Sequence, residues 1–441
     1  MAQGAFAAVL LALMAGIGML SPGVERFEPA LLSLNYGFLL LVAFLAGGLF
    51  KRIGLPRISG YIVAGIVTGP FLLGFIDAVQ VTKMKLIDDL ALSFIALTAG
   101  SELRLSVLKA RKRTIGFLIA SIVVMVSSGV VTATFALRAH LPFLAGFDAV
   151  QVAVAGALIG VIAVARSPTS AVAMIDECKA RGRFTDTVFG VTVAMDSLVI
   201  LLFALVVSVG VAVSQEGRGI DLLFVAVVLL QLLVSIGLGA CLALGVSYYI
   251  NRVGKELSVV LVVLAFLITV GSRWVSHAME ARFHLGFHLE PLLIAMAAGF
   301  TVTNFTGAGK RLSEGLHAIS LPVFVVFFAM AGAGLNLGAL EQTWLAAVAF
   351  VAIRMGLVSS AAYVGCALAG EEHGFRRHCG FAFYTQAGVS LGLTQEVVRR
   401  FPDWGPALGT LLVACITLNE IVGPVAFKYA LDRSGDSGRD P

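Results

Sequence analysis

Long runs of apolar residues dominate the chain, and they constrain its fold more than any other feature. Hydrophobic residues make up 59% of the 441 residues and charged residues 13%, whereas a soluble chain has roughly 45–50% and about 25%. The mean hydropathy of +0.97 agrees with this bias. So much apolar surface needs lipid as its solvent. The composition therefore predicts a membrane protein and excludes disordered, collagen-like, coiled-coil and nucleic-acid-binding chains.

About 20 apolar residues are needed for a helix to cross the hydrocarbon core, and we identify fourteen candidate spans. They lie near residues 3–21, 35–50, 58–76, 87–103, 115–137, 147–175, 186–213, 221–250, 256–275, 286–303, 317–337, 343–369, 378–398 and 405–428. We expect an all-α polytopic protein with about 14 transmembrane helices. No basic region precedes the first run, as a secretory signal would require, so residues 1–22 are expected to form an extra N-terminal transmembrane helix.

The positions of lysine and arginine predict the orientation. With a cytoplasmic N-terminus and alternating loops, twenty basic residues fall on the cytoplasmic side and nine on the other. Cytoplasmic loops are enriched in such residues, so we expect both termini in the cytoplasm and residues 431–441 to be a short cytoplasmic tail. A bacterial inner membrane is the expected location.

Three charged residues lie inside the predicted spans, where charge is costly and by default marks an ion or substrate path. Asp196 lies in the run at 186–213, Arg354 in the run at 343–369, and Arg166 in the run at 147–175. The alternative for each is a structural ion pair between helices.

Two spans carry the signs of an interrupted helix. Pro168 removes a backbone donor from the run at 147–175. Neighbouring hydroxyl groups can satisfy the freed backbone, and they belong to Ser167, Thr169 and Ser170. A second interruption is expected at Gln386 and Gly388. Secondary transporters build their ion sites from broken helices of this kind.

The order of the spans fits an inverted repeat. Residues 35–213 and 256–428 each hold six spans, residues 221–250 form a connecting helix, and the broken span is the fifth of each six. An odd connecting helix places the second repeat upside down in the membrane, which is a plan common among secondary transporters.

Several segments resemble the monovalent cation–proton antiporters, a superfamily that includes sodium/proton exchangers and Kef-type systems. They follow one another in the family's order: FKRIGLPRISGYIVAGIVTGP at 50–70, LSFIALTAGSEL at 92–103, LEPLLIAMAAG at 289–299 and LPVFVVFFAMAG at 321–332. The resemblance covers roughly residues 35–428. It implies a dimerisation half, a six-helix core that moves like an elevator, and a homodimer, with the extra first helix placing the chain in the fourteen-span branch.

The resemblance also implies roles for individual residues. Asp196 matches the aspartate that holds a proton or a monovalent cation in turn, and Arg354 matches the buried basic residue that balances its charge. Thr169 and Gln386 match the two crossing broken helices. The chain departs from the family in having Met195 before the aspartate, and one carboxylate rather than two favours one-for-one, electroneutral exchange. The other departure is the extra cation Arg166, which we expect to face Asp176, Glu177 or the lipid interface.

A buried carboxylate loses the solvation of its charged form, so Asp196 can hold a proton or a small cation but not both. Hydroxyl oxygens suit such a cation, and the candidate co-ligands are Ser167, Thr169, Ser170 and Ser197. Na⁺ or K⁺ and H⁺ are the expected cargo, and no cofactor is expected. The predicted function is antiport of a monovalent cation and protons.

Three alternatives stay open. Arg166 and Arg354 would suit a sodium-coupled symporter of organic anions, a class with a related architecture. A transport-inactive membrane sensor and an intramembrane enzyme are the others, although the metalloprotease motif HExxH is absent. Three acids near span ends are expected to have capping or structural roles, and they are Glu102, Glu290 and Glu420.

Overall fold

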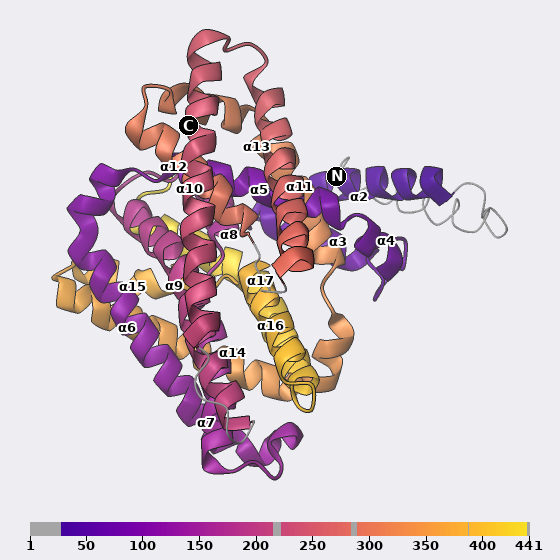
Figure 1. Cartoon of the computed structure of the whole chain (residues 1–441), viewed down its shortest axis with the longest axis vertical. Helices are drawn as coiled ribbons and strands as arrows, with labels where there is room; N and C mark the ends of the chain where they lie inside the picture. The colour runs from indigo at the N-terminus through magenta and orange to yellow at the C-terminus, as the bar shows by residue number, and fades with distance from the viewer. Residues whose placement is uncertain (1–27, 215–221, 284–288, 387, 439–441) are drawn as a thin grey trace.

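The computed structural model describes residues 28–214, 222–283, 289–386 and 388–438. Over these ranges the chain forms α-helices and short 3-10 helices without any strand (Figure 1). The predicted all-α fold is therefore confirmed. The predicted helix at 1–22 lies outside the described residues.

The first half of the described chain forms the helices up to α9, and the second half those from α10 on. The former are α2 Glu28–Arg52, α3 Arg57–Thr68, α4 Ala78–Lys83, α5 Lys85–Glu102, α6 Leu105–Leu137, α7 Ala149–Val164, α8 Pro168–Glu177 and α9 Arg183–Ser214. The latter are α10 Leu222–Arg252, α11 Leu257–Phe283, α12 Pro291–Phe305, α13 Gly309–Ala333, α14 Leu337–Ala369, α15 His373–Cys379, η4 Gly380–Phe383, α16 Gly388–Arg400 and α17 Gly405–Ser434.

Within the described ranges, nine helical segments are long and apolar enough to cross a membrane, with α7 and α8 counted together. The shorter apolar helices α3 and α12 add two more candidates. Each predicted span from 35–50 onward overlaps one helix or two or three consecutive helices. The number of crossings stays a prediction, because length and composition alone do not place a membrane.

The helices pack as two groups. The scaffold bundle consists of α2, α3, α5 and α10 to α13, in which α3 packs on α13 and α5 and α10 on α12. The core bundle consists of α6 to α9 and α14 to α17, in which α6 packs on α7 and α14, and α14 on α17. α10 follows α9, contacts it and runs along the long axis of the molecule (Figure 1).

Glycines let the scaffold helices touch backbone to backbone. A Cβ atom on any of four glycines would collide with a carbonyl oxygen of the opposite helix. The four contacts are Gly65 with Ala329, Gly332 with Ile62, Gly100 with Met296 and Gly299 with Leu97. The first two join α3 to α13, and the last two join α5 to α12. Each pair thus joins the second helix of one predicted repeat to the third of the other. The inverted repeat itself stays a prediction.

Two consecutive carboxylates at the end of α8 reach from the core bundle to the scaffold bundle. Glu177 accepts hydrogen bonds from the backbone N–H groups of Arg57 (2.5 Å) and Ile58 (3.4 Å), at the start of α3. Asp176 lies 3.1 Å from Nδ1 of His317 on α13. A cavity of about 480 Å³ is lined by both carboxylates and by residues of α2, α3, α13 and α17. This part of the boundary between the bundles is therefore held by polar contacts rather than by close packing.

The glycine contacts predict a strong steric effect. Gly100→Val should lower the melting temperature of the purified protein markedly, because overpacking at a tight contact costs about 1–3 kcal/mol or more. Gly271→Val in α11 is the control, since nothing lies within 4 Å of a Cβ added there. Thermal unfolding in detergent measures both variants. Equal melting temperatures would contradict the close approach of α5 and α12.

Candidate ion-binding site

The first interruption lies between α7 and α8. α7 ends at Val164, residues 165–167 are extended, and Pro168 is the first residue of α8. The side chain of Ser167 caps α8 by accepting a hydrogen bond from the Ser170 N–H group at 3.1 Å. Serine is a favoured residue at this position because it satisfies one of the unpaired N–H groups of a helix start. The interruption thus leaves carbonyls at the end of α7 and hydroxyls at the start of α8.

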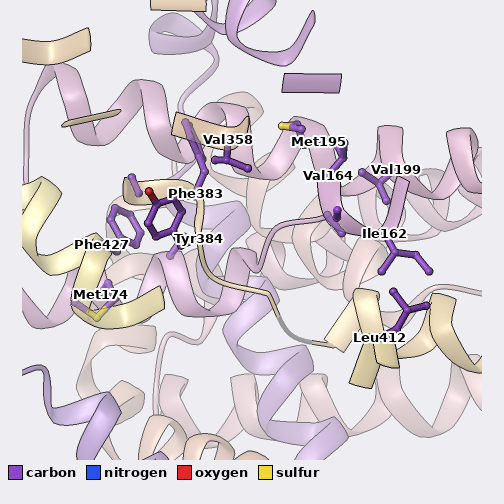
Figure 2. Packing of buried hydrophobic residues seen from close by; sticks show 14 of the residues in the cluster. Ile162, Val164, Met174, Met195, Val199, Val358, Phe383, Tyr384, Leu412 and Phe427 are labelled. Atoms are coloured by element: carbon purple, nitrogen blue, oxygen red, sulfur yellow. The ribbon is translucent and has the colours of Figure 1, made fainter. Parts of the chain in front are cut away.

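The second interruption lies between η4 and α16. Residues 384–386 follow the 3-10 helix η4, and α16 begins at Gly388. Gln386 crosses to the first interruption, where its Nε2 donates to the Ile162 carbonyl at 2.7 Å. This hydrogen bond joins segments 224 residues apart in the sequence. Buried hydrophobic residues surround the crossing, among them Ile162, Val164 and Phe383 (Figure 2).

Arg354 on α14 bonds to both interruptions. Its Nε donates to the Ala163 carbonyl at 2.8 Å, and its Nη1 donates to the Tyr384 carbonyl at 2.9 Å. The side chain is 3% exposed. Carbonyl groups at a helix end carry partial negative charge, which the guanidinium offsets. Arg354 is therefore bonded to backbone rather than to the carboxylate of Asp196.

Asn419 on α17 completes this arrangement, and the sequence analysis did not single it out. Its Oδ1 accepts from Nη1 of Arg354 at 3.1 Å, and its Nδ2 donates to Oε1 of Gln386 at 2.9 Å. It is fully buried. A polar residue within the predicted span at 405–428 was the signal that could have found it.

Asp196 lies on α9, which packs against α7, α8 and α16. The side chain is 7% exposed, and its Oδ1 atom is buried without a hydrogen-bond partner. The preceding Met195 is also fully buried (Figure 2). A buried carboxylate oxygen without a donor is unfavourable unless a proton or a cation satisfies it. Asp196 thus has the chemistry of a proton or cation site.

The predicted hydroxyl ligands occupy two places. Ser167, Thr169 and Ser170 are buried together at the start of α8, where Oγ of Ser167 lies 2.9 Å from Oγ1 of Thr169 and 2.9 Å from Oγ of Ser170. Ser197 lies next to Asp196 on α9 and is half-buried. The structure brings the first three into contact with one another rather than with Asp196.

Arg166 lies in the first interruption and is 1% exposed. Its guanidinium packs over the ring of Phe383, 5.5 Å from the centroid, and none of its three nitrogens has a hydrogen-bond partner. The expectation that it faces Asp176, Glu177 or the lipid is therefore wrong. Those acids bond to His317 and to the start of α3 instead, so Arg166 is held inside the crossing by packing.

Of the capping or structural role expected for Glu290, only the capping role is excluded. It is the residue before the first turn of α12, and its side chain makes no capping hydrogen bond there. Glu102 does have a structural role, because it accepts from Ser313 (2.9 Å) and lies 3.2 Å from Nε2 of His317.

Comparison with known proteins identifies the family. Residues 40–399 match the family described as sodium/hydrogen exchanger, transmembrane. The chain belongs to the sodium/hydrogen exchanger family. A comparison with curated proteins finds no match.

Solved structures show the same fold as this exchanger. A structure of the sodium proton antiporter MjNhaP1 from Methanocaldococcus jannaschii at pH 8 is similar at 15% sequence identity and a TM-score of 0.65, and the match covers 93% of this chain and 100% of that one. An electron-microscopy structure of the same antiporter is similar at 14% identity and a TM-score of 0.71, covering 92% and 98%.

The family match confirms two predictions made from the sequence, namely cation–proton antiport and the class of secondary transporter. The chain is a membrane-embedded cation–proton antiporter by family, and it is a secondary transporter rather than an enzyme. The ion site and its residues stay predictions, because similarity at 14–15% identity shows the fold alone.

The bonds of Asn419 predict its effect on stability. Asn419→Ala in the exchanger should lower the melting temperature, because Arg354 and Gln386 each lose a buried partner at a cost of about 1–3 kcal/mol. Thr410→Ala on the same helix is the control, since Thr410 is half-buried and its hydroxyl bonds to the Pro406 carbonyl of its own helix. If both variants melt at the same temperature, Asn419 does not stabilise the crossing.

Proposed function

We propose that this exchanger transports a monovalent cation, Na⁺ or K⁺, in exchange for protons, with Asp196 as the site that both share. The observation that carries the proposal is the buried Oδ1 of Asp196, which has no hydrogen-bond partner. It lies on a helix packed against both broken spans. A proton or a cation at this oxygen would remove the cost of burying the charge.

Coupling follows from the same cost. A bare carboxylate is too unfavourable to carry through an apolar barrier, so Asp196 crosses only with a proton or a cation bound. The two cannot bind together, because each neutralises the same charge. Export of one therefore requires the import of the other.

The hydrogen bonds at the crossing favour Asp196 as the cation ligand. The Ala163 and Tyr384 carbonyls accept from Arg354, and the Ile162 carbonyl accepts from Gln386. Backbone oxygens that would otherwise attract a cation are thus already bonded. We propose that the hydroxyls of Ser167, Thr169, Ser170 and Ser197 complete the coordination as the core bundle changes state.

The proposed movement is an elevator, in which the core bundle shifts along the scaffold bundle. Backbone contacts within the scaffold and polar contacts at the boundary support this division. We further propose a homodimer, cytoplasmic termini and location in a bacterial inner membrane, with lipid around the exposed apolar faces.

One observation favours a second candidate. Arg166 is a buried guanidinium without a hydrogen-bond partner, and such a group suits a carboxylate ligand. A sodium-coupled symporter of organic anions would use it. Uptake of labelled organic anions driven by a sodium gradient distinguishes this activity from proton flux.

Replacing Asp196 tests the proposed site. Asp196→Asn should abolish cation-driven proton movement, because the amide neither releases a proton nor offers a negative charge to a cation. The assay follows a pH-sensitive dye in proteoliposomes during additions of Na⁺, K⁺ or Li⁺ from pH 6 to 9.

An unchanged melting temperature of Asp196→Asn is the control for folding. Cation-dependent proton movement that persists in this variant, after correction for leak, would refute the mechanism. If the wild-type protein moves no protons with any of these cations, antiport is refuted. The symporter or a transport-inactive sensor is then favoured.

A further inference from the structure

A run of basic residues lies in the first turns of α6. Four of the five residues at 109–113 are basic, namely Lys109, Arg111, Lys112 and Arg113. α6 is a candidate membrane span of 33 residues, which is roughly 50 Å at the rise of an α-helix, whereas the hydrocarbon core is about 30 Å thick. Charge is costly inside hydrocarbon, so the excess length places these first turns at the level of the lipid headgroups.

The outward side of α6 changes from basic to apolar within two turns. Lys109, Lys112 and Arg113 are exposed and form the basic face of α6. The exposed residues Phe117 and Val124 follow, 37% and 65% exposed. Residues spaced by four and seven positions lie on one side of a helix, so the apolar surface continues directly from Arg113.

Arg113 joins the basic face to the apolar surface. Its Nη2 donates to the Leu368 carbonyl at 3.4 Å, at the end of α14. Its guanidinium lies over the ring of Phe117, 5.8 Å from the centroid. Leu368 is itself 54% exposed. A charged surface therefore adjoins an apolar surface that α6 and α14 share, and a phospholipid combines a charged headgroup and apolar chains in the same way.

The acids at this end of the core bundle are paired with other basic residues. Glu371 is 2% exposed and pairs with Arg111 at 3.3 Å and with Arg183 at 2.6 Å. Glu372 lies 3.8 Å from Arg183. Within the described ranges, none of the three residues of the basic face forms an ion pair. The basic face therefore offers positive charge to a ligand outside the protein.

Anionic lipids attract basic residues that lie next to a membrane-spanning helix, and each lysine or arginine strengthens the binding about fivefold. Lipids with a zwitterionic headgroup provide no net charge for this attraction. A phosphate ion in solution would match the charge of the basic face but not the apolar surface beside it. Of these ligands, an anionic phospholipid matches both surfaces.

We propose that the basic face of α6 binds the headgroup of an anionic phospholipid, such as phosphatidylglycerol, with the acyl chains along the exposed apolar residues of α6 and α14. Because α6 belongs to the core bundle, the lipid attaches to this bundle rather than to the scaffold bundle. The inference concerns the lipid and not the transported ion, so it does not depend on the proposed ion site.

The test removes two charges from the basic face in the variant Lys109→Gln/Lys112→Gln. The matched control is Arg252→Gln/Lys255→Gln, which removes two charges from exposed positions at the end of α10 and just after it, in the scaffold bundle. Native mass spectrometry of the full chain in detergent gives the apparent affinity for phosphatidylglycerol, and phosphatidylcholine with the same acyl chains is the headgroup control.

Wild type should bind phosphatidylglycerol at least about tenfold more tightly than phosphatidylcholine. The α6 variant should lose most of this preference, and the scaffold variant should keep it. Equal losses in the two variants would indicate a general effect of net charge and overturn the site. An unchanged preference in the α6 variant would overturn it as well.

A measurement on wild type locates the lipid without any substitution. Phosphatidylglycerol with a photoreactive diazirine near the top of one acyl chain should label residues at 105–124 and 363–369. Labelling confined to other parts of the chain would overturn the proposal. Inorganic phosphate, added at constant ionic strength, should not displace the lipid. Displacement would mean that the basic face binds a soluble anion, and the assignment to a lipid would then be wrong.

Discussion

The crossing of the two interrupted helices depends on the guanidinium of Arg354. An interrupted helix inside a membrane leaves carbonyl groups without partners, and each such group costs several kcal/mol in hydrocarbon. Arg354 reaches the Ala163 carbonyl from one side and the Tyr384 carbonyl from the other. Gln386 and Asn419 extend this bonding across the crossing. The broken spans are stable because these side chains replace the missing turns of helix.

These hydrogen bonds leave two charged side chains near the crossing without hydrogen-bond partners for a charged atom, the carboxylate of Asp196 and the guanidinium of Arg166. The helix ends are already compensated, so in the proposed mechanism it is the buried carboxylate of Asp196 that binds the positive charge. Arg166 remains as a cation held by packing over Phe383 rather than by hydrogen bonds.

Much of this arrangement could be predicted from the sequence, because its signals are local. A proline among hydroxyl residues predicts the break at Pro168, and a charge in an apolar run singles out Asp196 and Arg354. The partners of these residues could not be predicted in the same way. Arg354 bonds to segments 30 and 191 residues away, and only the packed bundle shows that they meet there.

Asn419 was missed for the same reason. It lies among the apolar residues of the last span, and nothing local shows that it meets Arg354 and Gln386. The orientation of Arg166 depended on the position of Phe383, more than two hundred residues away.

The acids at the end of α8 make the boundary between the two bundles more sensitive to salt than the scaffold bundle is. Glu177 and Asp176 hold the bundles together through charged hydrogen bonds beside a cavity of about 480 Å³, and salt partly screens such charges where they are exposed to solvent. The backbone contacts at Gly65 and Gly100 involve no net charge and are insensitive to salt. We therefore expect salt to weaken the joint between the bundles more than the packing within the scaffold.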